Sequence, residues 1–139
     1  MIKTCFSETY EADTPVASMR KLKPVANAIR NKYSEIVDPT PLVSTEEISN
    51  KLRRLHKPEY VEAVLTGEGY LAASAFGVWN EKIRDGVLAM HKGQIVGTEL
   101  AFKHGIAANI AQGFHHAGYN GGSGFCTFNG LALVANENP

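Results

Sequence analysis

Two adjacent histidines, His115 and His116, are the residues of this chain best suited to chemistry, because an imidazole can hold or move a proton near neutral pH. They lie in an eighteen-residue stretch, 112–129, with five glycines, three phenylalanines, one tyrosine and one cysteine, and without Lys, Arg, Asp or Glu. Neighbouring side chains diverge in a helix and in a strand. Both imidazoles can therefore face one site only where the backbone turns, and the nearby glycines permit such a turn. We predict a functional loop here.

Residue types alone leave two interpretations of this pair open: two structural histidines bonded to backbone groups, or two members of one site. Cys126 is likewise either a nucleophile activated by His116 or a buried, inert thiol, and we favour the second because a reactive thiol needs a lowered pKa that no sequence shows. The other three histidines lack the spacing of metal ligands, and we expect them in solvent or at helix ends: His56, His91 and His104.

The residues before the loop predict an α/β order. A long helical pattern over 83–102 contains Gly86, Gly93 and Gly97, which indicate either close packing against a sheet or a break near Gly93. Gly105 suits the end of that helix, and 106–111 is a short apolar run typical of a buried strand. In α/β sheets ligands bind beyond the carboxyl ends of strands, so the position of the loop fits a site.

Further elements surround this unit. We expect a first strand over 2–6, a short strand at 36–37, and a helix over 22–33 with one buried stripe formed by Val25, Ala28, Ile29 and Tyr33. Ser44 and Glu47 have capping-box spacing and predict a helix to about residue 52. Pro58 begins a helix that Gly67 ends, and Asn129 caps a last helix over 130–136.

The composition indicates a single globular domain. The chain has 139 residues, of which 44% are hydrophobic and 20% charged, and its 14 basic side chains balance its 14 acidic ones. We therefore expect no nucleic-acid partner and no membrane partner. Cys5 and Cys126 form no disulfide framework, and no secretory signal or spanning segment is evident, so we expect reduced thiols in the cytoplasm.

The motif resembles a known family. His115-His116-Ala117, six further residues, and then Gly-Phe-Cys-Thr-Phe-Asn over 124–129 are similar to the signature of the zinc-dependent histone deacetylases, which include bacterial deacetylase-like proteins and acetylpolyamine amidohydrolases. Segments 14–22 and 56–61 and the pair at 97–98 follow in the order of that family. The resemblance implies that 1–139 is the N-terminal portion of a histone deacetylase-like domain. The implied fold class is α/β: part of the arginase/deacetylase three-layer fold, with parallel strands and helices on both faces.

The resemblance also implies a reaction. The family hydrolyses an acyl amide, of the acetyl-lysine or acetylpolyamine type, with a zinc-bound water. By this likeness His116 would act as general base and then acid, and His115 would be its electrostatic partner; neither would bind zinc. Gly124 would offer its carbonyl to the substrate amide, Phe125 would form one wall of the acyl channel, and Cys126 would line the foot of the pocket.

The resemblance does not extend to the zinc ligands of the family. The family holds zinc with an Asp-x-His pair and a further aspartate downstream, whereas no Asp or His follows Asn129 here. Gly130 stands where the family commonly has aspartate, and Gln112 where it commonly has glycine. We therefore expect a chain that is incomplete, does not bind zinc alone and is inactive alone. The alternatives are a non-catalytic binding or structural protein derived from the fold, or one half of a split enzyme. An uncovered sheet edge predicts a homo-oligomer or a complementary C-terminal half as partner.

Overall fold

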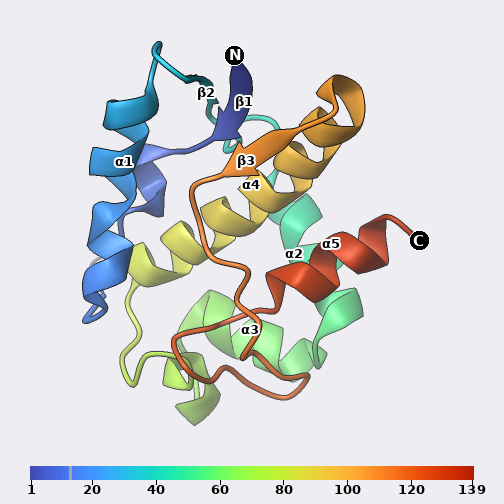
Figure 1. The fold of residues 1–139 in the computed structure, drawn as a ribbon. Helices are drawn as coiled ribbons and strands as arrows, with labels where there is room; N and C mark the ends of the chain where they lie inside the picture. The colour runs from blue at the N-terminus through green and yellow to red at the C-terminus, as the bar shows by residue number, and fades with distance from the viewer. Residues whose placement is uncertain (13) are drawn as a thin grey trace.

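A three-stranded parallel sheet lies at one end of the molecule. The computed structural model describes residues 1–12 and 14–139 (Figure 1). Its strands β1 (Ile2–Cys5), β2 (Ser34–Val37) and β3 (Ala107–Asn109) are arranged in the order β2-β1-β3. Lys3 of the central strand is in register with Glu35 on one side and with Ala107 on the other. The sheet is flanked by helices, so the α/β prediction is confirmed.

The described chain also contains five α-helices and three short 3-10 helices. The α-helices are α1 (Leu22–Ile29), α2 (Thr45–Leu55), α3 (Pro58–Thr66), α4 (Glu81–His104) and α5 (Gly130–Glu137). The 3-10 helices are η1 (Glu8–Tyr10), η2 (Ala17–Lys21) and η3 (Tyr70–Ala73). Among the described residues, no helix is both long enough and apolar enough to cross a membrane.

The helix ends predicted at Ser44, Gly67 and Asn129 are confirmed. The Ser44 hydroxyl accepts a hydrogen bond from the Glu47 amide at 3.0 Å, and the Asn129 side chain accepts one from the Ala132 amide at 3.0 Å. Gly67 ends α3 with φ of 81°, in the left-handed region that glycine adopts without steric cost. Local sequence signals therefore set these boundaries.

Helix α4 runs unbroken and packs against β1 and β3. Gly93 makes close packing possible, because a side chain there would overlap the Tyr10 hydroxyl and lie 2.5 Å from Asn109 Oδ1. That hydroxyl donates to Asn109 Oδ1 at 2.7 Å, and Asn109 Nδ2 donates to the Met90 carbonyl at 3.1 Å. The glycines thus reflect close approach to the sheet, and no break occurs near Gly93.

Two predictions about burial were wrong. The run over 106–111 contains an edge strand: β3 pairs with β1 on one side, Ile106 is 60% exposed and Ala108 is exposed. Helix α1 ends at Ile29, and instead of a buried stripe it buries only Ala26. Val25 is exposed on the helix itself, and Tyr33 is exposed beyond the end of the helix, after the chain turns at Asn31, where φ is 59°.

Candidate functional site

The stretch 112–129, here called the histidine loop, contains no helix or strand, as predicted. Its two imidazoles lie together, with ring centroids 3.9 Å apart and planes inclined by 46°. Both His115 and His116 are exposed rather than enclosed in a pocket. The turn before them is not made by a glycine as expected: Phe114 has φ of 57° and is 1% exposed. Burial of this ring holds a backbone conformation that a bulky residue rarely adopts.

A second strained turn faces the histidines. Gly124 and Phe125 have φ of 53° and 64°. The His116 ring lies over Gly124, where an added Cβ would be 3.1 Å from His116 Cδ2. Two of the three non-glycine residues with positive φ in the described part of the chain, Phe114 and Phe125, therefore flank the imidazole pair. Backbone strain of this kind concentrates at functional sites, where surrounding contacts maintain it.

The two residues after Gly124 differ in exposure. Phe125 is 47% exposed, its amide donates to the Ala75 carbonyl at 3.1 Å, and its ring lies 6.1 Å from that of Phe76. Cys126 is 2% exposed, and its thiol lies 3.5 Å from the Gly124 carbonyl. Phe125 is thus an exposed aromatic residue next to Gly124, while Cys126 is a buried free thiol. The catalytic and binding roles of these residues stay predictions.

His56 joins the middle of the histidine loop to its last residue, a role that the sequence did not reveal. It caps α2 and is 2% exposed. Its Nδ1–H donates to the Gly118 carbonyl at 2.8 Å, and its Nε2 accepts from the Asn129 amide at 3.1 Å. These partners specify the neutral tautomer with the proton on Nδ1. Burial lowers the pKa of His56, which favours the same neutral form. His56 therefore lies at a helix end, one of the two expected positions, and is buried there; His104 is exposed at the end of α4.

His91 packs against the histidine loop, a contact that the sequence also did not reveal. It lies within α4 and is fully buried, against the expectation of a solvated or helix-terminal residue. Its ring packs 5.2 Å from Phe114 and 5.8 Å from Phe128. Burial lowers the pKa of His91 to about 4, so it is neutral at pH 7. The signal that could have found it is that the residues three and four positions away on α4 are all uncharged: Val87, Leu88, Gln94 and Ile95.

Gln94 connects His91 to the loop. Its Oε1 accepts from His91 Nδ1 at 2.6 Å, and its Nε2 donates to the Gln112 carbonyl at 2.9 Å. The amide also fills the place of the side chain that Gly130 lacks, since a Cβ there would lie 2.5 Å from Gln94 Cδ. The backbone carbonyl of Gln112 therefore anchors the loop to Gln94, and nothing in the structure explains why residue 112 is glutamine.

The residues present do not fit a catalytic zinc site by themselves. Such a site takes three protein ligands, which hold the metal and leave one position open. Within 1–12 and 14–139, no group of three or more His, Cys, Asp or Glu side chains could hold a metal ion.

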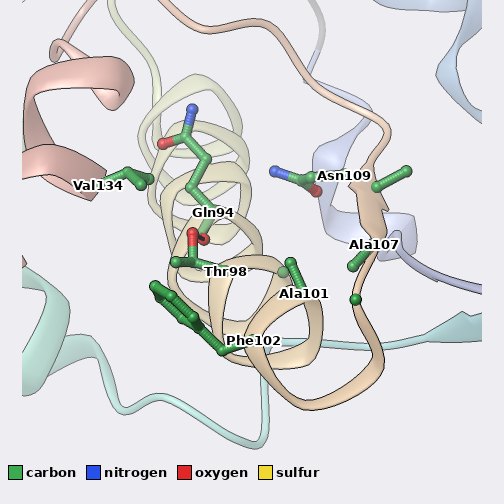
Figure 2. Close-up of a pocket in the computed structure, with 10 residues that line it drawn as sticks. Gln94, Thr98, Ala101, Phe102, Ala107, Asn109 and Val134 are labelled. Atoms are coloured by element: carbon green, nitrogen blue, oxygen red, sulfur yellow. Dashed lines mark hydrogen bonds between the residues drawn. The ribbon is translucent and has the colours of Figure 1, made fainter. Parts of the chain in front are cut away.

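A groove lies beside the exposed edge of the sheet. It has a volume of about 460 Å³ and is walled mainly by small and apolar side chains. Figure 2 shows that its walls come from three elements. Helix α4 contributes Gln94, Thr98, Ala101 and Phe102, strand β3 contributes Ala107 and Asn109, and helix α5 contributes Val134. Phe102 is 77% exposed, and Leu131 of α5 is 60% exposed. The groove thus adjoins both the free edge of β3 and the residue that anchors the histidine loop.

Comparisons with known proteins agree with the motif. The sequence model of the histone deacetylase domain matches residues 16–138. An uncharacterized protein of Picosynechococcus sp. is 38% identical over 87 residues, which are 60% of this chain and 28% of that protein. The chain thus matches little more than a quarter of the length of this relative. Because the family match covers nearly all of the sequence, the chain belongs to the histone deacetylase domain family.

Proposed function

We propose that this chain supplies the imidazole side of a deacetylase-type site that hydrolyses an acyl amide, of the acetyl-lysine or acetylpolyamine class. The observation that carries the proposal is the His115–His116 pair: the two ring centroids lie 3.9 Å apart, and the His116 ring lies against Gly124 in the turn at residues 124–125. In this proposal His116 accepts a proton from the attacking water and returns it to the leaving amine. His115, packed against it, stabilises the charge that His116 then carries.

The neighbouring turn supplies the substrate contacts in this proposal. The exposed ring of Phe125 forms a wall for the acyl group, and the Gly124 carbonyl accepts the substrate amide N–H. Cys126 fills the space behind that carbonyl and has no covalent role, since its thiol is buried. Its free thiol and that of Cys5 suit a reducing cytoplasm, which we propose as the location.

We further propose that the metal ligands come from a complementary segment and that this chain alone is inactive. Support comes from the lack of a metal-binding group in the described residues and from the greater length of the Picosynechococcus relative. The free β3 edge and the adjoining groove offer the place where a further strand could pair, or where a second copy could associate.

The test is a complementation assay with a fluorogenic acetyl-lysine substrate and zinc. This chain is assayed alone and with the part of the Picosynechococcus relative that follows the matched segment. We expect hydrolysis only when both polypeptides are present, and loss of at least about a hundredfold in rate on His116→Ala. Hydrolysis by this chain alone would contradict the need for a complement, and an inactive mixture that nevertheless forms a complex would favour the second candidate.

The second candidate is a non-catalytic binding or structural protein. The groove favours it, because an apolar surface of this size beside a free strand edge suits a peptide or protein ligand. Under this alternative, substitution of the histidines would leave partner binding unchanged, whereas substitution of Phe102 would weaken it.

A further inference from the structure

The histidine loop is held through its carbonyl groups. Before the imidazole pair, the Gln112 carbonyl accepts from Gln94 Nε2 at 2.9 Å and the Gly113 carbonyl accepts from the Leu131 amide at 3.2 Å. After the pair, the Gly118 carbonyl accepts from His56 at 2.8 Å. The bond from Gln94 is the one that comes from the middle of α4, the element that also packs on the sheet.

Two neighbours orient the Gln94 side chain for this bond: His91, which donates a hydrogen bond to it, and Gly130, which leaves room for it. His91, one helical turn before it, donates its Nδ1–H to Gln94 Oε1 at 2.6 Å. Because that oxygen faces His91, the amide nitrogen must face the loop, so the orientation of the amide is fixed. The glycine at 130 leaves the volume in which the amide lies, and any side chain there would overlap it.

The contacts of Gln94 extend through His91 and Phe114 to the imidazole pair. His91 is held by Gln94, and its ring packs 5.2 Å from Phe114, whose positive φ starts the turn into His115. The other ring nitrogen of His91, Nε2, is buried without a hydrogen-bond partner among the described residues. The orientation of His91 therefore depends on the bond to Gln94 and on packing alone.

We propose that Gln94 is a positioning residue of the His115–His116 pair: its amide fixes the Gln112 carbonyl and the His91 ring beneath Phe114, and it can do so only because residue 130 is glycine. The meaning of this role for catalysis rests on the proposed function. The positions of the two imidazole rings do not depend on the proposed function, so the proposal is tested on the rings themselves, without an activity assay.

The first experiment records the NMR signals of the His115 and His116 imidazoles and of the Gly113 amide. In Gln94→Met, which keeps the length of the side chain and removes both hydrogen bonds, we expect all three sets of signals to shift. Thr98→Val is the matched control. It lies one turn further along α4 and lines the same groove, and its hydroxyl bonds only to the Gln94 backbone carbonyl at 2.8 Å. Unchanged ring signals in Gln94→Met, or equal changes in Thr98→Val, would overturn the proposal.

The second experiment is a double-mutant cycle, which remains informative if Gln94→Met folds poorly. Gly130→Ala should lower the thermal midpoint and shift the same imidazole signals when Gln94 is present, because the new methyl group displaces the amide. In a Gln94→Ala background the space is empty, and Gly130→Ala should then leave the midpoint unchanged or raise it. An equal fall in the midpoint in both backgrounds would show that Gly130 and Gln94 are independent, and would refute the proposal.

Discussion

At the scale of single residues, the candidate site depends on backbone conformations that few residue types tolerate. Phe114, Gly124 and Phe125 all have positive φ, and the two imidazoles lie between them. The sequence identified the imidazole pair and the surrounding glycines. It could not show that Phe114 makes the first turn, because a phenylalanine at positive φ is stabilised by burial against His91 on another element.

The first prediction concerns Gly124→Ala. A left-handed conformation costs a non-glycine residue about 1–2 kcal/mol, and the added methyl group would also press on the His116 ring. Gly77→Ala is the matched control, since Gly77 has φ of 74° and its added Cβ would meet nothing within 4 Å. We expect both variants to lose stability in urea denaturation, and only Gly124→Ala to shift the His116 imidazole signals. A shift of equal size in Gly77→Ala would contradict the contact.

The second prediction concerns pH and His91. Its pKa is lowered from 6.5 to about 4 by burial, so the unfolded chain binds this proton at a higher pH than the folded chain. The free energy of unfolding should therefore be unaffected by His91 above pH 6.5, and should fall as the pH drops from 6.5 to about 4, by about 3 kcal/mol in total. His56, whose pKa is also lowered, adds a loss of the same sign.

The measurement is chemical denaturation at a series of pH values. His91→Leu should flatten the dependence between pH 6.5 and 4, and His104→Gln, which alters an exposed histidine, should leave it as in the parent. If His91→Leu kept the full slope, the proton uptake would have to be assigned to other groups.

At the scale of elements, helix α4 organises the molecule, since it packs against η1, β1, β3, α2 and α5. Its glycines differ in how closely neighbouring elements approach them. Gly93 faces the Tyr10–Asn109 hydrogen bond, whereas at Gly97 the nearest atoms to an added Cβ would be 3.8 Å away. Two glycines one turn apart on the same helix therefore have opposite tolerance for a side chain.

The third prediction compares these two positions. Gly97→Ala should stabilise the protein by up to about 1 kcal/mol, because alanine favours a helix over glycine and meets no obstacle. Gly93→Ala gains the same helix term but breaks the buried bond between Tyr10 and Asn109, which costs about 1–3 kcal/mol. Thermal denaturation should show a higher midpoint for Gly97→Ala and a lower one for Gly93→Ala. A rise in both midpoints would mean that α4 can move away from η1.

Helix boundaries were largely predictable from the sequence, and burial was not. The Ser44 cap, Gly67 and Asn129 act within one helical turn, so their neighbours in sequence suffice to recognise them. The exposure of β3 and the burial of His91 depend on which elements pack together. An apolar run such as 106–111 can form either a central strand or an edge strand, because its composition does not reveal how many strands pair with it.

At the scale of the whole molecule, the sheet has an open side. β3 is its edge, and the groove beside that edge has apolar walls with Phe102 and Leu131 exposed nearby. Exposed strand edges and apolar patches promote association in solution. The imidazole pair is also exposed on the surface.

The fourth prediction therefore concerns association through this groove. Phe102→Glu places a charge in the groove at a side chain that is 77% exposed, so it should change the free energy of unfolding by no more than about 0.5 kcal/mol. It should nevertheless abolish any dimer seen by sedimentation velocity at micromolar concentration, and weaken binding of the complementary segment at least about tenfold, since a charge there would be buried on binding. Tyr70→Glu is the control, because Tyr70 is 86% exposed and lies in η3, outside the groove. A parent protein that sediments as a monomer would rule out the homo-oligomer and leave the complementary segment as the candidate partner, and equal effects of the two substitutions would place the association surface elsewhere.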